Sequence, residues 1–142
     1  MDCGEYLKTD GTFSDWMVTH TTNYKIDYWV AHNANVEINL IHEYTPYTSN
    51  YMAGDNQLAW GPWIDTLHVY KTLYPTFNDF SLQNLSKEFL VLNEIYHLAD
   101  RLCVRTGKKF HQSMFDCVVT YMLLIRLIKT VNLNLFLGKG IG

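Results

Sequence analysis

The sequence predicts an α/β domain with parallel strands. Two short segments, residues 26–31 and 63–65, are aromatic and β-branched at most positions and end abruptly, as strands do. Each is followed by a segment with the apolar periodicity of a helix, and further helical segments complete the chain. An alternation of strand and helix is typical of parallel sheets covered by helices. A chain of 142 residues suffices for one domain that buries about two-thirds of its unfolded surface.

The first strand leads into a turn at residues 32–35 and then a helix from Val36 to Tyr44. A loop of about sixteen residues follows, at 45–61, and loops of this length are usually functional. After the second strand, Thr66 is expected to cap a helix that Pro75 ends. Ser81 is expected to cap the next helix, and another spans residues 93–104.

The last predicted helix is the one around which the rest of the chain is expected to pack. It follows Asp116 and has apolar residues at spacings of three and four, which predicts a mostly buried helix. These residues are Val118, Val119, Met122, Leu123, Ile125, Leu127 and Ile128. A carboxylate at the start of such a helix is held in a fixed place.

The chain divides into three parts by composition. Residues 1–12 are polar and are expected to form an N-terminal extension, and residues 13–131 form the domain, which opens with a short helix capped by Ser14. Residues 132–142 have three glycines in their last five positions and are expected to form a flexible tail.

Composition predicts a soluble cytoplasmic protein that does not bind membranes. The longest apolar stretch, residues 118–128, is interrupted by Thr120 and Arg126 and is too short for a membrane span. The three cysteines are far apart and include no C-x-x-C, so neither a disulfide framework nor a structural zinc site is expected. Reduced cysteines favour the cytoplasm.

Charge is unevenly distributed along the chain. Residues 1–70 contain nine acidic and two basic residues, whereas residues 71–142 contain nine basic and five acidic ones. Four of the basic residues, Arg101, Arg105, Lys108 and Lys109, precede His111. They form either a solvated loop or a local contact to the phosphates of a polyanion.

His111 and Asp116 form a candidate pair at the start of the last helix. On a continuous helix, residues five apart would point about 140° away from each other. They can therefore face one site only if His111 lies before the helix or in its first irregular turn. A histidine and a carboxylate so placed suggest a general base beside a metal ligand.

Three blocks of the sequence resemble the DEDDh family of 3′–5′ exonucleases. Residues 28–37, YWVAHNANVE, resemble the second motif of the family, in which HNA follows a strand. Residues 63–85 resemble the linker that follows, and residues 110–117, FHQSMFDC, resemble the third motif, H-x-A-x-x-D. The blocks occur in the family's order, and the resemblance covers roughly residues 13 to 130.

The resemblance implies an RNase H-like fold and hydrolysis of DNA from its 3′ end. Carboxylates of such enzymes hold two divalent ions, Mg²⁺ or Mn²⁺, which orient a water and stabilise the leaving oxygen. By position, Asp116 and Glu37 would be metal ligands and His111 the general base. His32 and Asn33 would approach the substrate or brace the site. The implied substrate is a single-stranded or frayed DNA end, to which Trp60 and Trp63 would add stacking surfaces.

Two departures from the family pattern leave two functions open. The second motif has Glu37 where the family has Asp, and the first motif, Asp-x-Glu, is missing, so the predicted fold is N-terminally truncated. The strand at 26–31 would then have one neighbour, near 63–65, and an open edge for a second chain or another copy. The chain is thus either an exonuclease that needs a partner or an inactive module that binds nucleic acid or protein.

Overall fold

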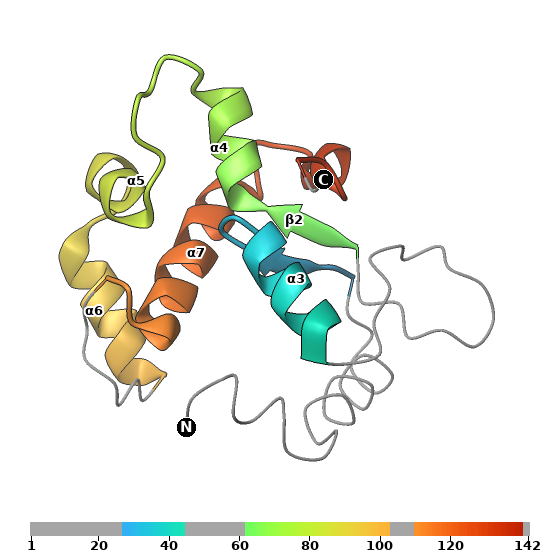
Figure 1. Ribbon diagram of the computed structural model, residues 1–142. Helices are drawn as coiled ribbons and strands as arrows, with labels where there is room; N and C mark the ends of the chain where they lie inside the picture. Colours follow the sequence, from blue (N-terminus) through green and yellow to red (C-terminus); the bar gives the residue numbers. More distant parts are fainter. Residues whose placement is uncertain (1–26, 45–61, 103–109, 141–142) are drawn as a thin grey trace.

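The computed structural model describes residues 27–44, 62–102 and 110–140, shown in colour in Figure 1. They form five α-helices, one 3-10 helix and a two-stranded parallel sheet, which confirms the predicted mixed α/β class. The elements are β1 (Trp29–Ala31), α3 (Asn35–Tyr44), β2 (Trp63–Asp65), α4 (Thr66–Leu73), α5 (Leu82–Phe89), α6 (Leu92–Arg101), α7 (Ser113–Leu127) and η1 (Leu133–Phe136). The helix predicted after Ser14 and the loop predicted at 45–61 lie outside the described residues.

The sheet pairs β1 with β2 in parallel, as predicted, with Trp29 opposite Trp63. Trp29 N donates to Pro62 O at 2.8 Å. Because successive carbonyls of a strand point to opposite sides, Trp63 O faces away from β1. It accepts a hydrogen bond of 2.8 Å from Gly138 N. The outer edge of β2 is therefore covered, whereas no other strand in the described ranges pairs with β1.

The segment that covers β2 belongs to the tail that the sequence predicts to be flexible. Within it, η1 is capped by Asn132, whose side-chain oxygen accepts from Asn134 N at 3.2 Å, and Leu133 is buried. Gly140 has a φ of +74° and lies so near His68 that a Cβ would come within 2.6 Å of the imidazole. This part of the tail thus packs against the sheet and α4.

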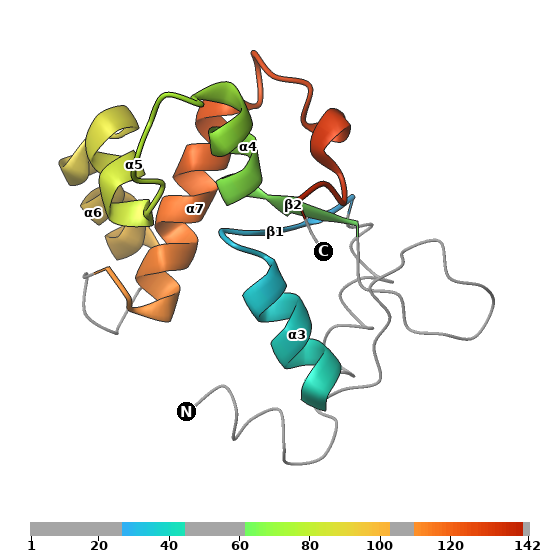
Figure 2. The same ribbon diagram turned by 45° about the horizontal axis from the view of Figure 1, so that its top comes forward.

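Helix α7 is the central element of the helical side of the molecule. It contacts α4, α5, α6 and β1, and Figures 1 and 2 show it among these helices. The residues buried around it form what we call the helical cluster: Ile64, Val69, Tyr70, Leu85, Ile95, Ala99, Phe115, Val118, Val119, Leu123, Leu124, Leu127 and Leu133. The hydroxyl of Tyr70, fully buried there, donates to Leu123 O at 2.8 Å. The predicted central role of this helix is confirmed.

A smaller group of buried residues lies where α3 packs on the sheet. This sheet cluster consists of Ala31, Ala34, Ile38, Ile41 and Trp63. In both ribbon views α3 lies apart from the other helices, beside the sheet (Figures 1 and 2). The two clusters lie on opposite faces of the sheet, because Ile64 of β2 belongs to the helical cluster and its neighbour Trp63 to the sheet cluster.

The caps of α4 and α5 differ in how well the sequence predicts them. Ser81 caps α5 as predicted, accepting from Asn84 N at 3.2 Å. The prediction that Thr66 caps α4 is wrong, because Thr66 is already helical and Asp65 accepts from Leu67 N at 2.9 Å. The hydroxyl of Thr66 lies 3.3 Å from Ala31 O instead. None of the described helices is long and apolar enough to cross a membrane.

Candidate functional site

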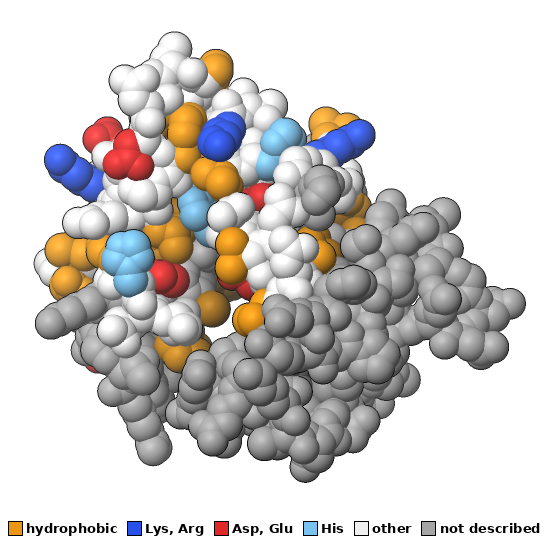
Figure 3. Space-filling view, viewed as in Figure 1, with side chains coloured by type: hydrophobic (Ala, Val, Ile, Leu, Met, Phe, Trp, Pro, Cys, Tyr) orange, Lys and Arg blue, Asp and Glu red, His pale blue; other side chains and the backbone are white. Residues whose placement is uncertain are grey.

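Three of the five predicted site residues line one cavity. The cavity has a volume of about 550 Å³ and lies between β1, α3, the start of α5 and α7. We call it the carboxylate cavity; it is lined by Val30, Ala31, His32, Glu37, Leu40, Leu82, Ser113, Asp116, Cys117, Thr120, Tyr121 and Leu124. It brings together Glu37, Asp116 and His32, but not His111 or Asn33. In the space-filling view, acidic and histidine side chains lie among hydrophobic ones on this face (Figure 3).

Glu37 enters the cavity from the first turn of α3. Its Oε2 atom is buried and has no hydrogen-bond partner among the residues that the structure describes. Burial raises the pKa of Glu37, and the negative charge of Asp65 adds to the shift. A buried carboxylate oxygen without a partner is costly, because desolvation is not offset by a hydrogen bond. This oxygen is therefore suited to a ligand that supplies positive charge.

Asp116 enters the same cavity from the first turn of α7. Its Oδ1 accepts a hydrogen bond of 3.1 Å from the backbone N–H of His111. His111 lies before the start of α7 and has a φ of +68°. A residue five positions before Asp116 can face the same site as Asp116 only from such a place outside the helix. Its exposed side chain is not among the residues that line the cavity. The contact between the pair runs through the backbone, and the role of the imidazole stays a prediction.

His32 is held between two other segments of the chain. Its Nε2 lies 2.7 Å from Phe80 O and its Nδ1 lies 2.9 Å from the hydroxyl of Thr66. Since a carbonyl only accepts, Nε2 must carry the proton that it donates to Phe80 O. Burial lowers the pKa of His32, which favours this neutral form. These contacts favour the bracing role over direct approach to a substrate.

Asn33 belongs to the turn that ends β1, and its φ is +67°. Its backbone N–H donates to Asp65 Oδ1 at 2.9 Å, and the same oxygen caps α4. Asp65 thereby ties the turn after β1 to the helix after β2. Asp65 was not among the residues predicted for the site. The available signal was its position at the carboxyl end of a parallel strand, beside the HNA turn.

Asn33 and His32 also line a second, polar pocket of about 390 Å³. Its other walls come from α4 and the segment before α5. They are Leu67, Lys71, Asn78, Asp79, Phe80 and Ser81. His32 thus lies on the boundary between this pocket and the carboxylate cavity.

Cys117 is a cavity residue that the sequence analysis did not single out. Loss of solvent around its sulfur raises the pKa of the thiol, and the charges of Glu37 and Asp116 raise it further. The residue as a whole is exposed, so the sulfur is only partly withdrawn from water. The charges of Glu37 and Asp116 both act on this thiol, as expected of two carboxylates that line the same cavity.

The two carboxylates fit a divalent cation only in part. In residues 27–44, 62–102 and 110–140 there is no group of three or more His, Cys, Asp or Glu side chains that could hold a metal ion. Mg²⁺, however, is often bound by one or two carboxylates, with waters and substrate phosphates as its other ligands. Glu37 and Asp116 supply oxygen donors of this kind, and no described residue competes for Glu37 Oε2 by a hydrogen bond.

Comparison of the chain with family models, with curated proteins and with solved structures found no match. The family resemblance therefore rests on the three sequence blocks alone. What those blocks imply for metal, substrate and reaction belongs to the proposal that follows.

Proposed function

We propose that the chain forms part of a metal-dependent 3′–5′ exonuclease with an RNase H-like fold. Its substrate is a single-stranded or frayed DNA end. One observation carries the proposal: Glu37 and Asp116, the two acids at the family's metal-ligand positions, line the same cavity. They come from different helices far apart in the sequence.

In this proposal each residue has a distinct role. Glu37 and Asp116 hold Mg²⁺ or Mn²⁺, which acts as a Lewis acid on the terminal phosphodiester when bound. His111, whose backbone is hydrogen-bonded to Asp116, takes the proton from the attacking water. His32 and Asp65 keep the HNA turn in place, since both bridge separate segments. The apolar walls of the cavity exclude water and strengthen the electrostatic interactions inside it.

Two carboxylates are fewer than the four that the family uses. We propose that the remaining acids come from a second chain or another copy that pairs with the outer edge of β1. Val30 and Ala31 of β1 line the carboxylate cavity, so a segment paired there would lie next to Glu37 and Asp116. Backbone groups at an unpaired strand edge favour such an addition.

The test is a nuclease assay on a 5′-labelled single strand with Mn²⁺. If another copy supplies the remaining acids, the parent chain should shorten the strand from its 3′ end, and Asp116→Asn and Glu37→Gln should each lower the rate about 10²-fold or more. Glu94→Gln, an exposed acid in the first turn of α6, is the matched control and should keep full activity. Intact substrate with the parent chain would show that the chain alone is not an exonuclease.

A second candidate is a non-catalytic module that keeps the fold and binds nucleic acid or protein. It is favoured by the lack of a three-ligand group in the described part of the chain. Thermal unfolding with and without Mn²⁺ separates the two candidates. A rise in Tm that Glu37→Gln removes supports the metal site, because only binding to the folded chain stabilises it. An unchanged Tm together with retention of single-stranded DNA supports the module.

A further inference from the structure

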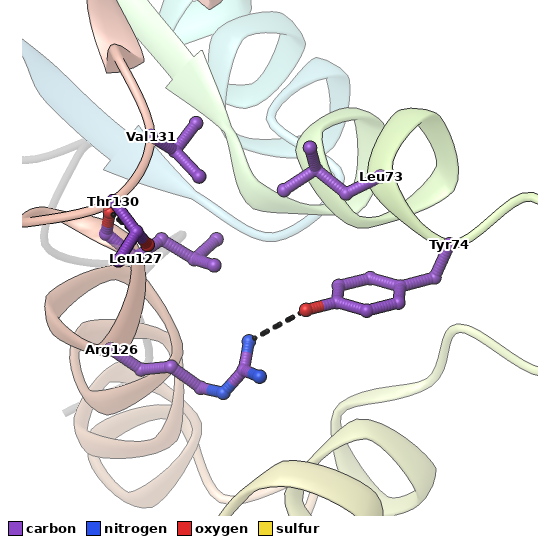
Figure 4. Close-up of a pocket in the computed structure, with 6 residues that line it drawn as sticks. All are labelled: Leu73, Tyr74, Arg126, Leu127, Thr130 and Val131. Atoms are coloured by element: carbon purple, nitrogen blue, oxygen red, sulfur yellow. Dashed lines mark hydrogen bonds between the residues drawn. The ribbon is translucent and has the colours of Figure 1, made fainter.

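A pocket at the far end of α7 from Asp116 contains a fixed arginine. Arg126 lies ten residues after Asp116, about 15 Å further along the helix. The pocket has a volume of about 380 Å³ and lies between the ends of α4 and α7. Its walls are Leu73, Tyr74, Arg126, Leu127, Thr130 and Val131, drawn in Figure 4. We call it the arginine pocket.

The guanidinium of Arg126 is held in place by aromatic neighbours. Its Cζ lies 4.2 Å from the ring centroid of Phe89, and Nη1 donates to the hydroxyl of Tyr74 at 3.1 Å. Figure 4 shows this hydrogen bond at one side of the pocket, with Leu73 and Val131 at the other. The ring of Tyr74 is itself packed 4.6 Å from that of Phe89. A cation stacked and hydrogen-bonded in this way loses little freedom on binding an anion.

The charge of Arg126 is not neutralised within the described part of the chain. The guanidinium contacts Tyr74 and Phe89, and the hydroxyl of Tyr70 is a further hydrogen-bonding neighbour; no described carboxylate forms an ion pair with it. No acidic residue lines the pocket either. Partial burial disfavours the cation, but hydrogen bonding to tyrosine outweighs this and raises the pKa of Arg126. A permanent positive charge without a counterion attracts an anionic ligand.

The rest of the pocket decides what kind of anion fits. A guanidinium pairs best with an oxyanion that presents two oxygens side by side, such as a phosphate. Leu73, Leu127 and Val131 form an apolar wall next to it, and Thr130 adds a hydroxyl. The volume lies within the range of small-molecule sites. A phosphate carried by a flat, largely apolar group uses both parts of the pocket.

We propose that the arginine pocket binds one nucleotide unit, with its phosphate on Arg126 and its nucleoside against Leu73, Leu127 and Val131. The choice of a nucleotide rests on the proposed function, in which DNA is the substrate. The site is separate from the carboxylate cavity and requires no metal. Bound there, a strand would be held about 15 Å from Asp116, measured along α7.

The test measures the affinity of the intact chain for deoxyadenosine monophosphate by NMR or calorimetry, with EDTA present to remove metal ions. Arg126→Met keeps an unbranched stem over Phe89 and removes the charge, and should weaken binding at least tenfold. Arg126→Lys should weaken it less, because the charge remains but the planar fork is lost. Lys87→Met, which removes an exposed positive charge in the last turn of α5, is the control and should bind as the parent does.

Deoxyadenosine and inorganic phosphate, tested alone, separate the contributions of the two halves of the ligand. Both should bind at least tenfold more weakly than the nucleotide. If Arg126→Met does not fold, Thr130→Phe at an exposed position replaces it, since the ring fills the pocket and should also block binding. The inference is overturned if parent and variant bind the nucleotide equally, or if the parent does not bind it. It is also overturned if the parent binds free phosphate as tightly as the nucleotide.

The outcome is independent of the nuclease assay. Glu37→Gln should bind the nucleotide normally, because it leaves the arginine pocket unchanged. A chain that fails to cleave DNA but binds the nucleotide through Arg126 refutes the exonuclease and keeps the pocket. A chain that cleaves DNA with Arg126→Met binding unchanged refutes the pocket alone.

Discussion

The helical cluster and the sheet cluster differ in size and in whether the buried polar atoms beside them have hydrogen-bond partners. Among the described residues, the first buries thirteen hydrophobic residues around α7, whereas the second buries five between α3 and the sheet. The buried hydroxyl of Tyr70 has a hydrogen-bond partner in the helical cluster, whereas the Oε2 of Glu37, on the helix that packs in the sheet cluster, has none within the same ranges. Buried apolar residues are thus concentrated around α7, whereas the buried carboxylate oxygen without a partner among the described residues lies beside the smaller cluster.

Phe115→Ala should have the largest effect, because it removes a ring from the centre of the helical cluster. Phe115 is almost fully buried and packs edge-on against Phe110, with centroids 5.3 Å apart. We expect the free energy of unfolding to fall by about 4 kcal/mol, measured by urea denaturation. A loss below about 1.5 kcal/mol would show that this cluster is not the main core.

His32→Gln should lower the free energy of unfolding by about 2 kcal/mol at pH 8, because His32 bridges Thr66 and Phe80. Its pKa is lowered from 6.5 in the folded chain, so the unfolded chain takes up a proton first as the pH falls. The parent should therefore lose stability as the pH falls through about 6.5. The variant lacks this loss, so the difference in free energy of unfolding between parent and variant should be smaller at pH 5 than at pH 8. A difference that does not change with pH would contradict a buried, neutral His32.

Glu37→Gln should raise the free energy of unfolding by about 1 kcal/mol at pH 8, because it removes a poorly solvated charge. Since the pKa of Glu37 is raised from 4.5, the folded chain takes up the proton first as the pH falls. The advantage of the variant should then shrink toward pH 4.5. Exposed Glu94→Gln should change stability by less than about 0.5 kcal/mol. Destabilisation by Glu37→Gln would mean that the carboxylate has a partner.

A matched pair of small changes compares the two clusters directly. Ile95 in the helical cluster and Ile38 in the sheet cluster are both buried. Ile95→Val should cost about 1 kcal/mol and Ile38→Val about 0.5 kcal/mol, because the smaller cluster can relax more easily around a lost methyl group. Thermal unfolding of the two variants measures the difference. Equal costs would show that the clusters are packed equally tightly.

Local patterns predicted most of the described fold. The apolar spacing in α7 located the central helix, and the aromatic and β-branched segments located β1 and β2 together with their parallel pairing. The packing of η1 was not predictable in this way. A glycine-rich end indicates flexibility locally, whereas the bond from Gly138 to Trp63 joins segments far apart in the chain.

The candidate site was predictable in three of its residues, Glu37, Asp116 and His32, but not in its contacts. Asp116 was singled out by its place at the start of the last helix and Glu37 by resemblance to a family, whereas periodicity alone cannot place the two in one cavity. The link from Asp65 to the N–H of Asn33 depends on how two strands align. Cys117 became a site residue only because α7 turns it toward that cavity.

The hydrogen bond between Gly138 and Trp63 limits how this sheet could grow. A sheet with two open borders can add copies of itself without end, as amyloid fibrils do. In the described part of the chain one border is already occupied, so a copy could be added only along β1. In a pair of copies joined there, the outer edge of β1 would be occupied in both copies. Strand-mediated association would therefore stop at a pair, the closed two-fold arrangement most common among soluble oligomers.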